Sequence, residues 1–367
     1  MATAYTWHPR VDLNHSVWPR TQPIMEDELL TSWLVRTALA HGCSPLALTS
    51  IIWPKWRALS CDLDRGLSSD RASSLASLAG CSVSEVSNCC LDSIAEAISE
   101  RPIGKATWPW ILVRGTRNLR SAAGLQLCPL CFAEGPPYYR ISGRLAWHFS
   151  CPRHQVWLID RCPNCWTSLQ PQRLLPPDQD CGACHLCGYR FALSPVESTC
   201  ESDMLFQQAA DECLSGHCVA GSQLMTTADW FLWARMVQSF IRCASLHPTQ
   251  SISAILRDLG VQMLATSPSG LALEALAVRE RAELLAQTWK VMSFDHEILA
   301  QVFRAHALSR SALPLPRGCH APSSISGILE ALQSGASRHR KSGAGLHGVP
   351  NVAKAWARLQ RKFSRDG

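Results

Sequence analysis

Residues 128–188 read CPLCFAEGPPYYRISGRLAWHFSCPRHQVWLIDRCPNCWTSLQPQRLLPPDQDCGACHLCG, and this stretch decides the fold of the chain. It contains four pairs of soft metal ligands, each pair separated by two residues. The pairs are Cys128 and Cys131, Cys151 and His154, Cys162 and Cys165, and Cys184 and Cys187. This spacing lets one tight turn direct both side chains at a single ion. The eight ligands therefore predict two structural Zn²⁺ ions, one in a Cys₃His site and one in a Cys₄ site.

Two arrangements of these pairs are compatible with the sequence. Consecutive pairing joins the first pair to the second across 19 residues and the third to the fourth across 18. Such near-equal loops are typical of two tandem zinc ribbons, and we favour this arrangement. Interleaved pairing, as in cross-braced fingers, leaves only 7 residues between the second and third pairs. Cys181 lies close to Cys184 and is an alternative ligand for the fourth pair. Gly188 favours Cys184 and Cys187 as that pair, because a ligand-bearing turn often needs a positive φ after its second ligand.

Both predicted sites are saturated by protein ligands, so neither leaves a coordination position for water or substrate. A zinc-dependent nuclease would need an open site or clustered carboxylates. The acidic residues flanking the fourth pair are few: Asp178, Asp180, Glu201 and Asp203. The sequence therefore predicts a protein that is not an enzyme.

The composition is that of a globular protein. Of 367 residues, 47% are apolar and 17% charged, which is enough for two or three domains. Met1 to Arg20 contains no apolar run that would form a signal peptide, and no run of eighteen apolar residues could span a membrane. We therefore expect a cytoplasmic protein. The chain has 18 cysteines, and we expect most of those outside the metal pattern to be small buried apolar residues.

Helical patterns flank the metal pattern on both sides, so we predict a mainly α protein with small β zinc ribbons. The predicted parts are an extended N-terminal arm (1–23), an N-terminal helical domain that resembles a helix-turn-helix (24–120), a tandem zinc-ribbon module (121–200), a C-terminal helical domain (201–342) and a basic C-terminal helix (343–367). Strand-like pieces are expected at 138–141, 145–149 and 156–159. C-terminal helices are expected at 230–241, 271–289, 294–307 and 325–332.

In the N-terminal domain, apolar residues recur at helical spacing over 28–40, and Asp27 is placed to cap this helix. A second helix is expected over 46–52. Two further helices within 69–100 are joined by Gly80, and Ser82 with Glu85 predicts a capping box. This layout resembles a helix-turn-helix. Its second helix carries no basic residue before Arg101, so packing or protein binding is favoured over the reading of DNA bases.

The net charge of +6 is modest, but basic residues are concentrated in two zones. From Arg101 to Arg173 there are ten basic residues and two acidic ones, and the C-terminal tail is also basic. Such zones indicate contact with a polyanion, although each can also be an ordinary solvated face. The candidate nucleic-acid or partner contacts are Arg114, Arg117, Arg120, Arg140 and Arg144.

Three places in the chain resemble the TniQ family, the target-selection proteins of transposons, which includes TnsD. The first is ELLTSWLVR at 28–36 followed by AHG at 40–42. The second is the order of the four ligand pairs, with Trp147 and His148 ahead of the second pair. The third and weaker one is RERA at 279–282.

The resemblance implies a non-catalytic adaptor that marks a DNA target and recruits an AAA+ regulator (TnsC or TniB), which engages the transposase. Some members bind an attachment sequence directly. Others dock, often as a homodimer, onto a Cascade-type CRISPR effector complex whose guide RNA finds the target DNA. The chain is shorter than direct DNA readers such as TnsD, which favours the docking type. The alternative is a sequence-specific zinc-ribbon and helix-turn-helix protein that recognises a transposon attachment site directly.

Overall fold

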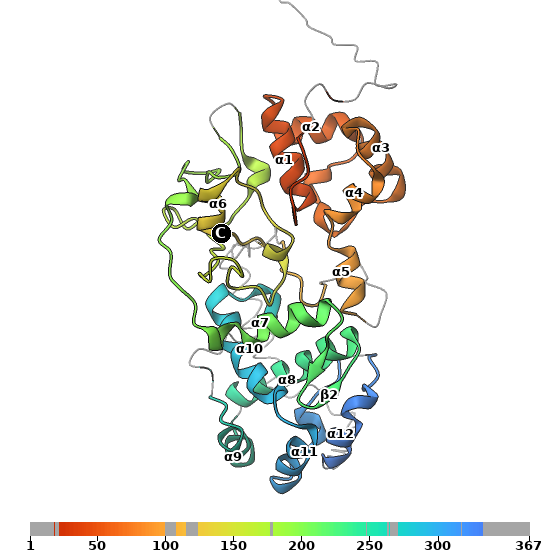
Figure 1. Ribbon diagram of the computed structural model, residues 1–367, viewed down its shortest axis with the longest axis vertical. Coiled ribbons are helices and arrows are strands. Elements are labelled where there is room, and N and C mark those ends of the chain that lie inside the picture. Colours follow the sequence, from red (N-terminus) through yellow and green to blue (C-terminus); the bar gives the residue numbers. More distant parts are fainter. Residues whose placement is uncertain are drawn as a thin grey trace, which may run out of the picture. The chain divides into compact units, whose positions relative to one another are not determined.

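The computed structural model describes residues 18, 22–99, 108–114, 124–176, 179–246, 248–262, 264, 271–316 and 318–332 (Figure 1). They all belong to one compact unit that extends to Gln333. Most of the predicted N-terminal arm and the whole predicted helix at 343–367 lie outside these residues. The predicted domain boundaries at 120, 200 and 342 remain predictions.

The described chain is mainly α-helical, as predicted. The N-terminal helices are α1 (Leu30–Ala40), α2 (Pro45–Ile52), α3 (Ser69–Ala79), α4 (Val83–Asn88) and α5 (Asp92–Ala97). A single short helix, α6 (Pro129–Glu134), lies among the described metal-ligand residues. The C-terminal helices are α7 (Glu201–Leu214), α8 (Thr227–Leu246), α9 (Gln250–Asp258), α10 (Val278–Met292), α11 (His296–Ala305) and α12 (Ser326–Ala331). In the described part of the chain, no helix combines the length and apolarity that crossing a bilayer requires.

Short 3₁₀ turns connect these helices. They are η1 (Ala58–Ser60), η2 (Leu63–Arg65), η3 (Ser142–Arg144), η4 (Pro171–Arg173), η5 (Phe191–Leu193), η6 (Leu273–Ala275), η7 (Arg310–Ala312) and η8 (Ser323–Ile325). The described residues form one two-stranded sheet, an antiparallel hairpin of β1 (Val219–Ala220) and β2 (Gln223–Leu224). Gly221 turns this hairpin at φ 58°, and a Cβ there would lie 2.2 Å from the carbonyl oxygen of Phe294.

The start of α1 differs from the prediction. Leu29 occupies the N-cap position and makes no side-chain cap bond. Asp27 adopts φ 57°, and its carboxylate accepts hydrogen bonds from the hydroxyl and the backbone N–H of Ser142 at 2.6 and 3.3 Å. Asp27 therefore connects α1 to the metal-ligand region and does not cap the helix.

The turn between α3 and α4 has the predicted geometry. Gly80 ends α3 in the left-handed conformation, and the Ser82 hydroxyl and the Glu85 carboxylate form the capping box of α4. However, α4 ends at Asn88 and a separate helix, α5, follows it. The exposed residues of α4 carry no positive charge. The helix-turn-helix function stays a prediction.

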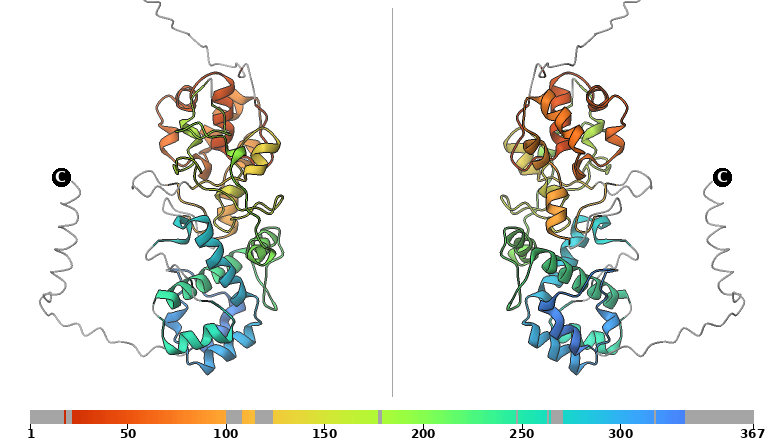
Figure 2. Two further views of the ribbon diagram at one scale, coloured as in Figure 1. Left: turned by 90° about the vertical axis from the view of Figure 1, so that its left-hand side faces the viewer. Right: turned by 90° about the vertical axis from the view of Figure 1, so that its right-hand side faces the viewer.

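The main core joins segments that are distant in the sequence. The indole ring of Trp110 lies 5.9 Å from the ring of Phe206 on α7 and 5.5 Å from that of Phe231 on α8. Trp147, from the metal-ligand region, lies 4.9 Å from Phe231. Figure 2 shows the C-terminal helices, in green to blue, gathered in one part of the molecule. Their buried side chains contribute to this core. A second, smaller core lies within the N-terminal helices, around Trp33.

Two buried cysteines outside the metal pattern are bonded to each other. Cys213 at the end of α7 and Cys218 just before β1 form a disulfide. The bond joins cysteines five positions apart in the sequence, and both belong to the main core.

A buried ionic network connects the N-terminal helices to the metal-ligand region. The Arg144 guanidinium is fully buried and lies 2.6 Å from Asp62 and 2.8 Å from Asp64. It also donates a hydrogen bond to the Leu112 carbonyl at 3.1 Å. Burial alone would lower the pKa of Arg144, but the charges of the two carboxylates outweigh it and raise the pKa above its ordinary value. Arg144 is therefore permanently charged and paired.

We predict that Arg144→Met will lower the free energy of unfolding by about 3–5 kcal/mol, because two carboxylates then stay buried without their partner. Urea denaturation followed by circular dichroism measures this loss. The matched control is Arg190→Met, which breaks an exposed pair with Asp180 and should cost at most about 1 kcal/mol. Equal losses in the two variants would contradict the structural role of Arg144.

Candidate metal centres

The metal-ligand region, residues 124–176 and 179–200, contains few regular elements. Its three predicted strands form only isolated bridges, such as Leu127 with Ile159 and Ser150 with Trp157. Three of its hydrogen-bonded turns carry ligands. The backbone N–H groups of Gln155, Trp166 and Gly188 donate to the carbonyls of Cys151, Cys162 and Cys184, each at 2.8 or 2.9 Å.

Each of these turns ends in a left-handed residue. The φ angles are 51° for Gln155, 58° for Trp166 and 71° for Gly188. The sequence predicted this conformation only at Gly188, because the other two turns adopt it without glycine. The remaining turn is the start of α6, where Cys128 is the N-cap residue and Pro129 occupies the first helical position.

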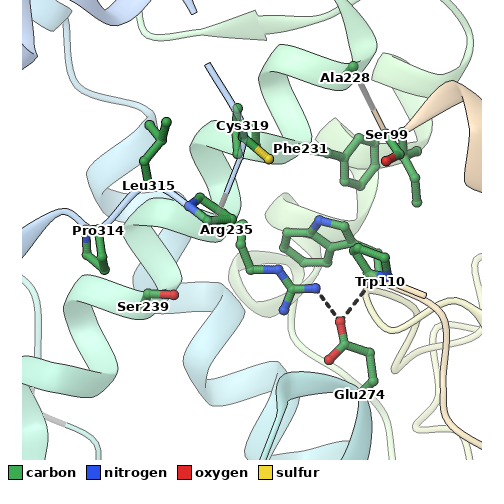
Figure 3. A pocket seen from close by; sticks show the side chains of 14 residues that line it. Ser99, Trp110, Ala228, Phe231, Arg235, Ser239, Glu274, Pro314, Leu315 and Cys319 are labelled. Carbon is green, nitrogen blue, oxygen red and sulfur yellow. Dashed lines mark hydrogen bonds and ion pairs between the residues drawn. The ribbon is translucent and has the colours of Figure 1, made fainter. Parts of the chain in front are cut away.

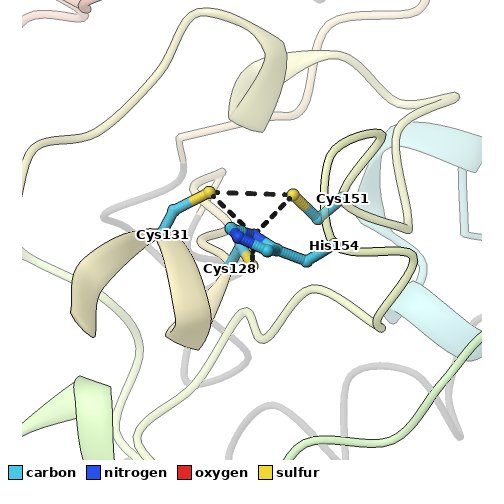
Figure 4. A group of neighbouring side chains, drawn as sticks. All are labelled: Cys128, Cys131, Cys151 and His154. Atoms are coloured by element: carbon cyan, nitrogen blue, oxygen red, sulfur yellow. Dashed lines mark hydrogen bonds between the residues drawn. The ribbon is translucent and has the colours of Figure 1, made fainter. Parts of the chain in front are cut away.

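The first cluster consists of Cys128, Cys131, Cys151 and His154 (Figure 4). The Nδ1 atom of His154 lies 3.4 Å from the sulfur of Cys128, 3.3 Å from that of Cys131 and 3.5 Å from that of Cys151. The sulfurs of Cys131 and Cys151 are 3.7 Å apart. With Zn–S bonds of about 2.3 Å and Zn–N bonds of about 2.0 Å, the ligand atoms of a tetrahedral site lie about 3.5–3.8 Å apart. The cluster therefore has the dimensions of a Cys₃His zinc site.

The second cluster consists of Cys162, Cys165, Cys184 and Cys187. The sulfur of Cys162 lies 3.6 Å from that of Cys187, and the sulfur of Cys165 lies 3.7 Å from that of Cys184. These separations also fit a tetrahedral Cys₄ site. Consecutive pairing of the ligand turns is therefore correct, and interleaved pairing is wrong.

Cys181, which competed with Cys184 in the sequence, is not part of either cluster. Its side chain is buried in the main core, and burial raises the pKa of its thiol. A buried neutral thiol of this kind is a small apolar core residue.

Neighbouring polar groups orient two of the ligands. The carboxylate of Glu134 lies 3.0 Å from Nε2 of His154, so Nδ1 of this histidine is left to face the ion. The side-chain amide of Asn164 donates to the sulfur of Cys187 at 3.5 Å, and this bond together with the backbone N–H of Tyr189 lowers the pKa of Cys187 to about 6. In the first cluster, hydrogen bonds from Cys128 and Cys131 lower the pKa of Cys151. The Asn164 amide favours the thiolate form of Cys187 that a metal requires, whereas the sulfurs of the first cluster shift one another in opposite directions and the pKa of Cys128 is raised. The sequence carries no signal for the roles of Glu134 and Asn164.

The arginines predicted to contact nucleic acid or a partner differ in their burial and in the groups that they contact. Arg144 and Arg114 do not form a surface for a partner: Arg144 is fully buried, and the Arg114 side chain is 9% exposed, with its guanidinium 3.7 Å from Asp64. The prediction for these two residues is corrected, because buried carboxylates of the N-terminal helices hold them inside the protein. Arg140 is half-buried and its guanidinium lies over the ring of Tyr138. Arg117 and Arg120 lie outside the described residues.

Two of the segments that carry the family resemblance lie together in the structure: the segment with Trp147 and His148, and residues 279–282. Trp147 Nε1 and His148 Nε2 both lie within 2.9 Å of one carboxylate oxygen of Asp211 on α7. The buried guanidinium of Arg281 on α10 donates to the backbone carbonyl of Ala146 at 3.0 Å and to the side-chain oxygen of Gln126 at 2.5 Å. These bonds hold two C-terminal helices against the metal-ligand region.

A cavity of about 440 Å³ lies beside α8, away from both clusters (Figure 3). Its walls include Trp110, Phe231 and Leu315. Glu274 accepts a hydrogen bond from the backbone N–H of Trp110 at 2.8 Å and forms an ion pair with Arg235. The two charged residues of the cavity therefore neutralise each other.

We predict that the purified protein contains about two Zn²⁺ per chain, one for each cluster. Cys151→Ala and Cys187→Ala should each reduce the content by about one, since three ligands remain at the altered site. Plasma mass spectrometry of the desalted protein measures this. Cys181→Ala is the matched control and should keep both ions. A loss of zinc in that control would show that the assigned ligand set is wrong.

We also predict that Glu134→Ala will weaken zinc binding at the first cluster by about 10–100-fold, because His154 loses the group that orients its ring. Competition with a chelator should show one ion released earlier and the other unchanged. Glu197→Ala serves as the control, because this exposed carboxylate pairs with Arg279 and contacts no ligand. If both variants release zinc as the wild type does, Glu134 has no such role.

Comparison with known proteins agrees with the resemblance. Residues 19–158 match the TniQ family model. This segment includes α1 to α6 and all four ligands of the first cluster. No curated protein matches the chain. The chain therefore carries a TniQ domain, the domain of transposition-associated target-selection proteins.

Proposed function

We propose that this protein is a non-catalytic adaptor in transposition. In this proposal it links a DNA-targeting complex, a Cascade-type CRISPR effector with its guide RNA, to an AAA+ regulator of the TnsC or TniB kind and, through it, to the transposase. The proposal places the adaptor in the cytoplasm at the target DNA, where it acts as a homodimer. The TniQ domain over residues 19–158 is the observation that carries it.

The metal centres support a structural role over a catalytic one. We propose Zn²⁺ as the ion of both clusters, since soft thiolates with one imidazole at tetrahedral separations suit this metal. Four protein ligands fill each site, so no position is left at which an ion could activate water. The residues hold the ion, and the ion stabilises the turns that carry them.

The N-terminal helices support docking over the reading of DNA bases. The exposed residues of α4 are Val83, Ser84, Glu85, Ser87 and Asn88. Base edges in the major groove are read mainly by arginine, lysine, asparagine and glutamine. Asn88 alone of these residues has such a side chain, and Glu85 would repel the phosphates. The direct reader of an attachment site is therefore the second candidate.

The test is reconstitution with the regulator and the effector complex of the same transposon. We predict that the adaptor co-purifies with the effector complex and with the regulator, and that guided insertion is lost without it. Cys151→Ala should abolish both, whereas Cys181→Ala should keep both. Binding of the adaptor alone to one attachment sequence, with no guide needed for insertion, would instead establish the second candidate.

A further inference from the structure

The turns of the second cluster expose two large apolar side chains. Trp166 is 72% exposed and Leu186 is 67% exposed. Each residue is next to a cysteine of this cluster, and the four sulfurs bring the two turns together. Two exposed arginines, Arg161 and Arg173, belong to the same region. We call these four residues the knuckle surface.

The backbone at Trp166 is fixed and strained. Its N–H donates to the carbonyl of Cys162 at 2.9 Å, and its φ of 58° costs a residue with a side chain about 1–2 kcal/mol. The equivalent position in the fourth ligand turn is Gly188, which adopts this conformation without strain. Because the indole is mostly exposed, burial does not compensate for the strain. Packing among the described residues therefore does not account for a tryptophan at this position.

The two arginines belong to the turns around the second cluster. The Arg161 guanidinium donates to the backbone carbonyl of Trp166 at 3.4 Å. Arg173 ends η4, which lies between the third and fourth ligand turns in the chain, and its side chain is exposed. Within the described part of the chain, neither arginine forms an ion pair with a carboxylate. Both remain able to contact an anion.

An exposed indole with arginines in the same group of turns matches the chemistry of an unpaired nucleotide. Proteins that bind single strands combine aromatic rings, on which bases stack, with cations that follow the phosphates. A Cys₄ site with Zn²⁺ carries a formal charge of about −2, so the two arginines balance the cluster and do not create a strong positive field. Stacking should therefore contribute more to the affinity than charge does.

We propose that the knuckle surface binds single-stranded DNA. One base stacks on Trp166, an adjacent nucleotide packs against Leu186, and Arg161 and Arg173 each contact a phosphate. The choice of DNA rests on the proposed function, in which target DNA is the nucleic acid that the adaptor meets.

The first experiment measures binding of a fluorescein-labelled twenty-nucleotide oligo-thymidine to the full-length zinc-loaded protein by fluorescence anisotropy. Trp166→Ala should weaken binding at least about fivefold, since one stacked base is lost. Trp166→Phe should keep most of the affinity. Both variants should retain their zinc, because alanine and phenylalanine meet the same backbone requirement as tryptophan.

The second experiment measures how the affinity depends on salt. Arg161→Ala and Arg173→Ala should each reduce the slope of log K against log salt by roughly 0.7, the value for one phosphate of a single strand. Arg190→Ala is the matched control on the same turns, because Arg190 is equally exposed but pairs with Asp180 at 2.9 Å. It should leave the slope unchanged. Ultraviolet crosslinking of the oligonucleotide should map to Trp166.

Three results would overturn the proposal. The first is an unchanged affinity of Trp166→Ala for the oligonucleotide. The second is tighter binding of the matching RNA strand, lost in the same variants, which would make the ligand RNA. The third is normal DNA binding by Trp166→Ala combined with loss of co-purification with the effector complex or the regulator, which would make the surface a protein interface. If guided insertion does not require the protein but Trp166→Ala still loses DNA, the proposed function fails and this inference stands.

Discussion

The tetrahedral grouping of four ligands at each cluster is the constraint on which the rest of the structure depends. Residues 124–176 and 179–200 form isolated bridges and short turns, so backbone hydrogen bonding alone specifies little of their path. The clusters join turns that lie about twenty residues apart in the sequence. A bound ion would stabilise this arrangement directly, because the energy of coordination becomes energy of folding. The strained turn at Trp166 persists only because the surrounding ligands define it.

Once the metal-ligand region is formed, buried charges attach it to helices on both sides. Arg144 binds the carboxylates of Asp62 and Asp64 next to the N-terminal helices. Arg281 on α10 and Asp211 on α7 bind the segment around Trp147. These contacts are costly to break because each removed partner leaves a buried polar group unsatisfied. They explain why the described residues form one compact unit.

This arrangement is well suited to an adaptor. The clusters are closed, and the charged residues of the cavity beside α8 neutralise each other. The exposed groups of the knuckle surface, Trp166 above all, are suited to contact with a partner. The TniQ domain covers the N-terminal helices and the first cluster, whereas the knuckle surface lies beyond it. Recognition of the knuckle surface therefore depends on structure and not on the family match.

The sequence by itself determined the features that depend on neighbouring residues. These are the eight ligands, the left-handed Gly188 and Gly80, the capping box at Ser82 and most helices, because short-range spacing and local backbone preference suffice for them. Tertiary structure alone decided which turns form one ligand cluster, that Asp27 bonds Ser142, and that Arg144 and Arg114 lie inside the protein. An arginine has the same local sequence signal whether it faces water or a distant carboxylate. Its position depends on long-range partners, which only the folded chain brings together.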